Sequence, residues 1–153
     1  MKRQEGGPVY VVDELRGIRG LKLDIVRYEG QIATLRSASL HVTARPQEGG
    51  KGTPETDTIG NYVAKIAEMN ETLLKKIVDC QARIMEVEEE IDKLPANYRQ
   101  VLRLRYFEGM AWKAIPKVMN YTRQHCERIH SYALEEIRNK TIKCGEMLQK
   151  KAL

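Results

Sequence analysis

The chain has 153 residues, of which 6% are aromatic and 31% are charged, and its net charge is +5. So few aromatic residues exclude one large globular core and favour long helices, in which narrow apolar stripes run between charged faces. The charge is uneven, with a net −2 over residues 1–94 and a net +7 over residues 95–153. A basic end predicts a polyanionic partner, although a lysine-rich tail that only keeps the protein in solution fits the charge equally well.

The three cysteines, Cys80, Cys126 and Cys144, are scattered and form no CxxC pair. Each falls within a helical apolar pattern, so we expect buried free thiols, as in a reducing cytoplasm. No run of about 18 apolar residues is present, and residues 1–6 lack the apolar core of a secretion signal. The sequence therefore predicts a cytoplasmic protein that does not associate with a membrane.

The first predicted element is a long helix over residues 10–38. Its apolar residues recur at alternating steps of three and four, which is the heptad seam of a helix that packs along another helix. They are Ile18, Leu21, Ile25, Tyr28, Ile32 and Leu35. Gly17, Gly20 and Gly30 each weaken a helix interior by about 1 kcal/mol relative to Ala, so this helix needs a partner surface.

A second, longer helix is predicted over residues 58–93. Its seam consists of Ile59, Tyr62, Ile66, Met69, Leu73, Ile77, Cys80, Ile84, Val87, Ile91 and Leu94. Two consecutive steps of four residues, from Met69 to Leu73 and on to Ile77, shift the phase of the seam as a stutter does.

Residues 39–57 separate the two helices and hold two prolines and three glycines among polar residues, which predicts a flexible loop. Two long helices with matching seams and such a loop favour an antiparallel hairpin. The same seams could pair between two chains and give a homodimer, but we favour packing within one chain. The prediction is an all-α fold, with a helical hairpin or coiled-coil stalk over residues 1–94 and a second domain over residues 95–153.

The second domain is predicted to begin with a helix from Pro95 to Phe107. Proline fits the first turn of a helix, where its missing N–H has no intrahelical acceptor. Gly109 is the expected stop, because a glycine adopts the left-handed conformation that often ends a helix. The residues available to cover a core are Tyr98, Val101, Leu102, Leu104 or Arg105, and Tyr106.

Two further helices, Trp112–Met119 and Arg123–Ile137, are predicted on either side of the short segment 120–122. Asn120 tolerates the left-handed conformation of a sharp turn, and the Thr122 hydroxyl can cap the second helix. The inward positions of two crossed helices are occupied by apolar residues, namely Ile115, Met119, Tyr121, Cys126 and Ile129. This pattern predicts a helix-turn-helix, whose second helix enters the major groove of DNA.

The outward face of that second helix carries side chains able to contact DNA: Arg123, Gln124, Glu127, Arg128 and Ser131. Arginine pairs bidentately with guanine and glutamine with adenine, while Lys113, Lys117 and helix N-terminal amides can hold phosphates. Glu127 fits either the reading of cytosine or an ion pair with Arg123 or Arg128. A basic, polar face is also common on ordinary solvated helices, and it is the turn and the inward apolar residues that favour DNA.

The segment LPANYRQVLRLRY at residues 94–106, followed by EGMAW at 108–112, MNYTRQH at 119–125 and IHSYAL at 129–134, resembles sigma-70 region 4. The resemblance covers about 45 residues, 94–137, and is nearest to small sigma-like proteins of phages and prophages of Gram-positive bacteria. It implies promoter DNA binding through Thr122, Arg123, Gln124, Glu127 and Arg128, and contact with host RNA polymerase.

Two residues depart from the region 4 pattern. Pro116 stands in place of a small alanine, and an interior proline costs a helix about 3 kcal/mol, so we expect the first helix of the motif to be short, kinked or frayed. Cys126 replaces a branched aliphatic residue and thins the core slightly. Nothing upstream resembles the sigma segment that recognises the −10 element, which argues against a complete sigma factor.

Other classes of function find little support in the sequence. Cys126 and His130 lie one turn apart, but two ligands are too few for a structural zinc site. No phosphate-binding glycine loop, HExxH motif or nucleophile elbow is present, so we expect neither an enzyme nor a cofactor. Two alternatives to a promoter-binding regulator remain: a module that binds RNA polymerase or another regulator with little DNA affinity, and a nucleic-acid protein without sequence preference.

Overall fold

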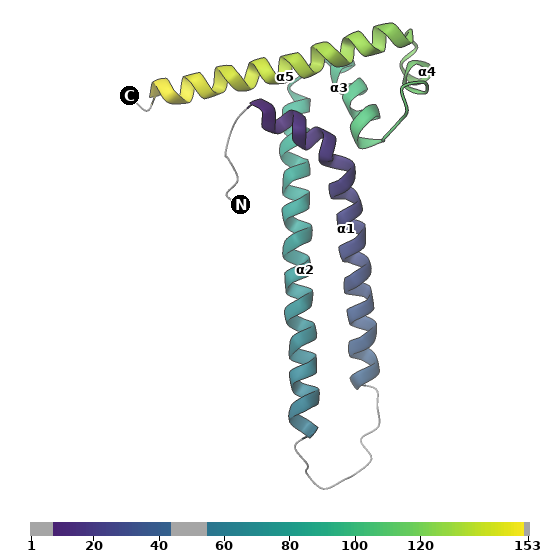
Figure 1. Ribbon diagram of the computed structural model, residues 1–153, viewed down its shortest axis with the longest axis vertical. Helices are drawn as coiled ribbons and strands as arrows, with labels where there is room; N and C mark the ends of the chain where they lie inside the picture. Colours follow the sequence, from purple (N-terminus) through teal and green to yellow (C-terminus); the bar gives the residue numbers. More distant parts are fainter. Residues whose placement is uncertain (1–7, 44–54, 152–153) are drawn as a thin grey trace. The chain divides into compact units, whose positions relative to one another are not determined.

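The computed structural model describes the backbone of residues 8–43 and 55–151, and the side chains of 11–42 and 60–140. All the secondary structure in these ranges is helical, which confirms the predicted all-α class (Figure 1). In chain order the elements are α1 (Pro8–Thr43), α2 (Glu55–Asp92), α3 (Ala96–Leu102), a π-helical turn η1 (Arg103–Phe107), α4 (Ile115–Met119) and α5 (Arg123–Lys151).

The two long helices extend into the predicted loop. Helix α1 continues to Thr43 and α2 begins at Glu55, so residues 39–43 and 55–57 of the predicted loop are helical. The rest of that loop lies outside the described residues. No proline or glycine occurs between Ala38 and Thr43, and the first helix breaker is Pro46, which explains why α1 runs on.

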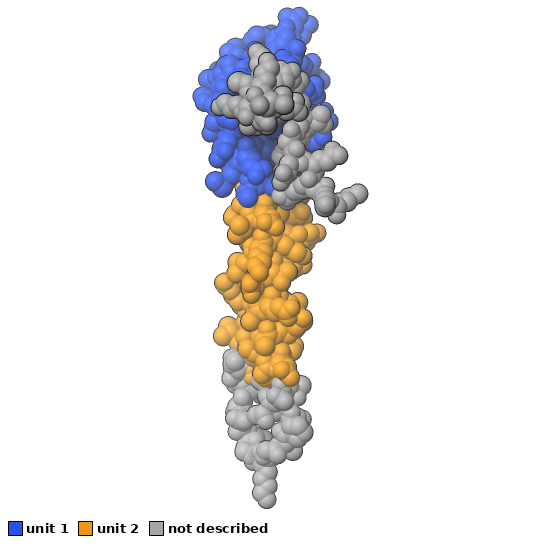
Figure 2. Space-filling model, turned by 90° about the vertical axis from the view of Figure 1, so that its left-hand side faces the viewer, with its two compact units in different colours: residues 1–21, 82–153 blue, residues 22–81 orange. Residues whose placement is uncertain are grey.

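The contacts divide the chain into two compact units, which Figure 2 shows in different colours. One unit contains the residues up to Leu21 together with those from Ala82 onward, and the other contains Lys22–Gln81. Each long helix therefore contributes to both units. The contacts place the divisions inside α1 and α2 and not at the predicted boundary between residues 94 and 95.

Within the unit Lys22–Gln81, α1 and α2 run antiparallel and pack through the predicted seams (Figure 1). Buried Ile32, Leu73 and Ile77 contact one another, and partly buried residues of α1 surround them, namely Ile25, Tyr28 and Leu35. The seams of the two helices thus meet within one chain, as the hairpin prediction requires.

Two residues of the predicted α2 seam lie at its exposed edge. Tyr62 and Met69 are 51% and 44% exposed, whereas Ile66 between them is 5% exposed. The two four-residue steps that follow Met69 turn the apolar stripe around the helix, and Met69 is left at the rim, where it lines a groove with Leu35 and Leu73. The side chain of Ile59 lies outside the described residues.

The unit that contains the C-terminal helices has a core to which each of the described α-helices, α1 to α5, contributes. Its buried members are Val12, Leu15, Ile18, Val87, Ile91, Leu94, Val101, Leu102, Ile115, Met119, Cys126, Ile129, Ala133, Leu134 and Ile137. A bidentate ion pair between Arg83 and Glu14, with Nη2 at 2.8 Å from both carboxylate oxygens, joins α2 to α1 beside this core. The first turns of α1 are therefore structural parts of the unit that carries α3, α4 and α5.

The predicted helix from Pro95 to Phe107 ends through a π-helical turn and a glycine. Helix α3 widens into η1 in its last turn, where the Glu108 amide donates to the Arg103 carbonyl at 3.0 Å. Gly109 follows with φ +68°, which confirms the predicted left-handed stop. The Met110 amide then closes the end of the helix by donating to the Leu104 carbonyl at 2.9 Å.

Substituting Gly109 by Ala is expected to lower the free energy of unfolding by about 1–2 kcal/mol, because an L-residue is strained in the left-handed region. An added Cβ would also lie 2.9 Å from Nε of Arg19, which must then move aside. Gly17→Ala is the matched control: its Cβ would meet nothing within 4 Å inside α1, so the change should raise stability by about 1 kcal/mol. Urea denaturation measures both, and changes of the same sign would contradict the backbone explanation.

Candidate nucleic-acid interface

The turn between α4 and α5 has the geometry predicted from its residues. Asn120 adopts φ 54° and ψ 39°, and it is the only non-glycine residue with positive φ in the described part of the chain. The Tyr121 amide donates to the Pro116 carbonyl at 3.2 Å. The Thr122 hydroxyl oxygen accepts a hydrogen bond from the His125 amide at 3.2 Å, and this caps α5 as predicted.

The first helix of the motif is short, as Pro116 led us to expect, but it begins later than predicted. Helix α4 covers Ile115–Met119, whereas the sequence predicted a start at Trp112. Pro116 therefore lies in the first turn, where its missing N–H leaves no helical hydrogen bond unmade, and the penalty for an interior proline does not apply. Residues 112–114 form a turn in which the Ala114 amide donates to the Ala111 carbonyl at 2.9 Å.

Four of the five predicted inward residues of the motif are buried: Ile115, Met119, Cys126 and Ile129. The fifth, Tyr121, was predicted wrongly, since it is 43% exposed and its ring meets the edge of His125 at a centroid distance of 4.7 Å. The chain turns left-handed at Asn120 and points the next side chain outward. Burial raises the pKa of the free Cys126 thiol, which favours its protonated, unreactive form.

Helix α5 extends to Lys151, beyond the predicted end at Ile137, and its first turns carry most of the predicted DNA-contacting residues. Side chains from consecutive turns line a shallow hollow of about 370 Å³, namely Gln124, Glu127, Arg128, Ser131 and Tyr132. The structure thus brings four predicted residues together and adds Tyr132, which is 55% exposed. The spacing of four residues from Arg128 was the sequence signal that would have included Tyr132.

The polar side chains on this face differ in whether they already have partners. Nε of Arg123 lies 2.9 Å from a carboxylate oxygen of Glu127. Of the two ion pairs that the sequence allowed for Glu127, with Arg123 or with Arg128, the structure forms the one with Arg123. The Ser131 hydroxyl donates to the Glu127 carbonyl at 3.0 Å. Within the described part of the chain, Gln124 and Arg128 make no side-chain hydrogen bond or ion pair, so both are available to a ligand.

Lys113 and Lys117 lie in and just before the other helix of the motif. Both are exposed, with Lys117 on α4 and Lys113 in the turn before it, and neither lines the hollow on α5. Thr122 and Arg123, at the very start of α5, do not line it either. The predicted site therefore consists of one cluster on α5 and separate cations near α4.

An aromatic cluster lies behind the motif and involves His130. The Trp112 ring is edge-on to the His130 ring at 4.9 Å, and the Arg105 guanidinium lies 5.2 Å from the centre of the Trp112 ring. The Tyr106 hydroxyl and Nε2 of His130 share a hydrogen bond of 2.9 Å, whose direction depends on the tautomer of the imidazole. Trp112 is partly buried and packs against the core.

Stability is expected to fall as the pH drops below about 6.5 because of His130. Burial, and then the positive charges of Arg105 and Arg16, lower the pKa of His130 from its ordinary value of 6.5. The unfolded chain therefore takes up the proton first, so this contribution is complete above pH 6.5 and is lost as the pH falls through the folded-state pKa.

Urea denaturation of the wild-type chain and of His130→Gln between pH 7.5 and 5 tests this effect, at values chosen on either side of the ordinary histidine pKa of about 6.5. The variant cannot take up the proton, so the part of the pH dependence that His130 causes should disappear. His125→Gln, which changes an exposed histidine on the same helix, is the control and should keep the wild-type dependence. An unchanged slope in His130→Gln would contradict the assignment.

A short first helix, a left-handed Asn120 turn and a capped second helix on a shared core define a helix-turn-helix domain. Residues 91–139 match the family model described as Sigma-70, region 4. The predicted resemblance is therefore confirmed at the level of a region 4-like helix-turn-helix, a domain type that binds DNA in transcription regulation. No curated protein and no solved structure matches the chain. None of the described helices is both long and apolar enough to cross a bilayer.

Proposed function

We propose that the protein is a transcriptional regulator of phage or prophage type that acts in the cytoplasm and binds promoter DNA through the first turns of α5. The observation that carries the proposal is the exposed face of this helix. Arg128 and Gln124 project from it without partners in the described part of the chain, beside a hollow that also exposes Tyr132. The region 4-like match over residues 91–139 supports the same assignment.

The contacts divide by chemistry into those that read bases and those that hold the DNA backbone. Arg128 suits a guanine and Gln124 an adenine, since each side chain can make two hydrogen bonds to a base edge in the major groove. Lys113, Lys117 and Arg123 surround this face as phosphate contacts, which position the helix without reading sequence. Glu127 orients Arg123 through their 2.9 Å ion pair and lies where it can accept from a cytosine amino group.

The same proposal includes contact with host RNA polymerase, which the resemblance to region 4 implies. In the part of the chain that the structure describes, α1 and α2 form a long hairpin upstream of the motif. The protein would then act as a regulator that binds a promoter and engages polymerase.

Selection of bound sequences from a random duplex pool, with the purified full chain, tests the proposal. One enriched motif is the expected result, and its affinity should fall steeply with salt. Release of counterions from three phosphate contacts, by Lys113, Lys117 and Arg123, lowers affinity about 40-fold between 50 and 200 mM salt.

A flat salt response without an enriched motif would refute DNA binding by this face. If a parallel pull-down then retained RNA polymerase, the domain would be a protein-interaction module. Equal affinity for random and selected DNA would refute promoter recognition and leave a nucleic-acid protein without sequence preference.

A further inference from the structure

The hairpin unit Lys22–Gln81 carries a second apolar stripe on each helix, in addition to the seam that packs inside the chain. On α1 the stripe consists of Leu23, Val26, Gly30, Ala33, Ser37 and Leu40, at alternating steps of three and four. On α2 it consists of Val63, Ala67, Asn70, Leu74, Val78 and Gln81. No charged residue occupies any of these twelve positions, which we call the outer face, although the positions between them are rich in Lys, Arg, Asp and Glu.

The outer face exposes large apolar side chains. Leu23 and Leu40 are both 69% exposed, Val26 is 63%, Val78 is 61% and Leu74 is 50%. A contiguous apolar patch of this kind marks an interaction surface more often than scattered exposed residues do.

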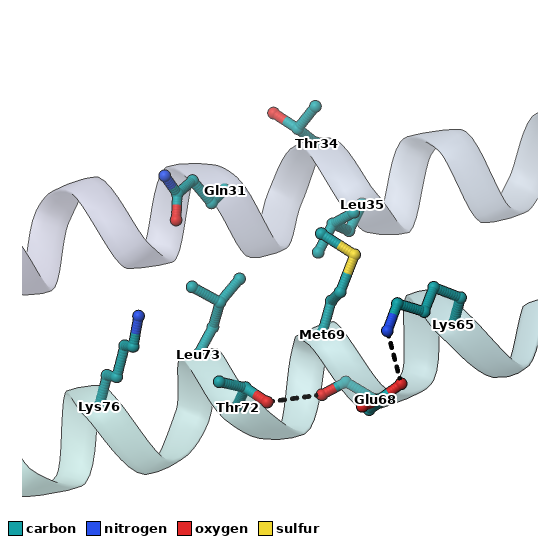
Figure 3. A pocket seen from close by; sticks show the side chains of 9 residues that line it. All are labelled: Gln31, Thr34, Leu35, Lys65, Glu68, Met69, Thr72, Leu73 and Lys76. Atoms are coloured by element: carbon teal, nitrogen blue, oxygen red, sulfur yellow. Dashed lines mark hydrogen bonds and ion pairs between the residues drawn. The ribbon is translucent and has the colours of Figure 1, made fainter.

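The stripes of the two helices adjoin at a groove of about 370 Å³, which is lined from α1 by Arg36, Ser39 and Leu40, and from α2 by Val63, Ile66, Ala67 and Asn70. The opposite side of the hairpin has a different chemistry, as Figure 3 shows for a groove of about 540 Å³. Its rim is polar: Lys65 pairs with Glu68 at 3.0 Å, and the Thr72 hydroxyl donates to the Glu68 carbonyl at 3.0 Å.

Two details of the outer face point to a covering helix. Oδ1 of Asn70 is buried and is the only buried side-chain atom without a hydrogen-bond partner in the described residues. Gly30 lies in the middle of α1, where a Cβ would meet nothing within 4 Å, so the fold of one chain gives no reason for a glycine there. A missing side chain allows the backbone of another helix to approach closely.

We propose that the outer face binds the same face of a second copy of this chain, so that two hairpins form a four-helix bundle. The outer face is large enough to form a dimer interface. The stripes extend over about 26 Å of helix and the pair of helices is about 20 Å wide. Two copies would bury roughly 1,000 Å² of planar area in total, which reaches the size that a specific interface needs.

The chemistry of the face fits a copy of itself. The twelve positions of the outer face carry no charge, although Arg36 lines the groove beside them, and isologous pairing requires only a self-complementary patch. Oδ1 of Asn70 is buried within the chain, so the amide must rotate toward a partner. Because an asparagine side chain holds both a donor and an acceptor, two twofold-related Asn70 side chains turned toward each other then pair and fix the register, as a single asparagine does in coiled coils. This dimer leaves the seams inside each hairpin intact and uses a different surface from theirs.

Sedimentation equilibrium of the full chain tests the proposal at concentrations up to about 100 μM. The wild-type protein should be a dimer, and Leu74→Glu combined with Val78→Glu should raise the dimer dissociation constant at least about 100-fold, because the charges would be buried. Gln31→Glu combined with Thr72→Glu, on the opposite side, is the matched control and should stay dimeric.

Asn70→Asp is a second variant that keeps the shape of the side chain. It places two carboxylates against each other across the twofold axis and should also weaken the dimer. If far-UV circular dichroism shows that the Leu74→Glu and Val78→Glu double variant has lost helix, Asn70→Asp becomes the variant that tests the dimer interface. A monomeric wild-type chain would overturn the proposal. A dimer that both outer-face variants retain, or that the control loses to the same extent, would also overturn it.

Discussion

Replacing Leu15 by Ala should lower the free energy of unfolding of the helix-turn-helix domain by about 2–5 kcal/mol, the range for large-to-small changes in a closed core. Leu15 is 1% exposed and belongs to the cluster that also buries Ile115, Cys126 and Ile129. The deleted methyl groups leave a cavity that residues from α1, α2 and α5 line together, and such a site collapses poorly. A change near the N-terminus should thus destabilise a motif about a hundred residues further along the chain.

Met85→Ala, another large-to-small change in a long helix but outside the outer face, is the control. Met85 is 59% exposed, so its loss should change stability by less than about 1 kcal/mol. Chemical denaturation followed by Trp112 fluorescence measures both variants, because Trp112 packs against the helix-turn-helix core. Equal effects of the two substitutions would mean that the first turns of α1 do not support this core.

Replacing Arg128 by Ala should weaken binding to the selected DNA by about 1–3 kcal/mol, or roughly 5- to 150-fold, through loss of one bidentate contact to a base. Arg128 has no partner within the described residues, so its whole hydrogen-bonding capacity is available. The loss should be specific to one base pair of the site and small on random DNA. Arg123→Ala should cost less, since Arg123 must first give up its contact with Glu127.

Arg138→Ala provides the control for Arg128, with the same change at an exposed position ten residues further along α5. Fluorescence anisotropy with the selected duplex and with a duplex mutated at one base pair at a time compares the variants. If Arg128→Ala and Arg138→Ala lowered affinity equally, or if no base pair lost its influence in Arg128→Ala, the assignment of this face would be wrong.

The features that could be predicted from the sequence are those that depend on local chemistry. The left-handed turn at Asn120, the Thr122 cap and the Gly109 stop each follow from what one side chain allows its own backbone to do. The seams of α1 and α2 follow from apolar spacing, because a helix presents every third or fourth residue to the same side. The region 4-like motif combines both kinds of signal.

The features that could not be predicted depend on which surfaces meet. Periodicity showed that Leu21 and its neighbours face a partner, but it could not show that the first turns of α1 pack beneath the helix-turn-helix. Pro116 was read as an interior residue because spacing does not fix the residue at which a helix starts. Tyr121 was placed inside because its apolar ring suited the core, although the turn at Asn120 directs it outward.

The divisions inside α1 and α2 mean that the DNA-binding domain is discontinuous in sequence. Residues 22–81 are an insertion between its first helical turns and the rest of it. The Glu14–Arg83 ion pair and the buried apolar residues of the same unit join the two halves of the domain. Lengthening or shortening the inserted hairpin by whole heptads should therefore leave the core of the domain intact.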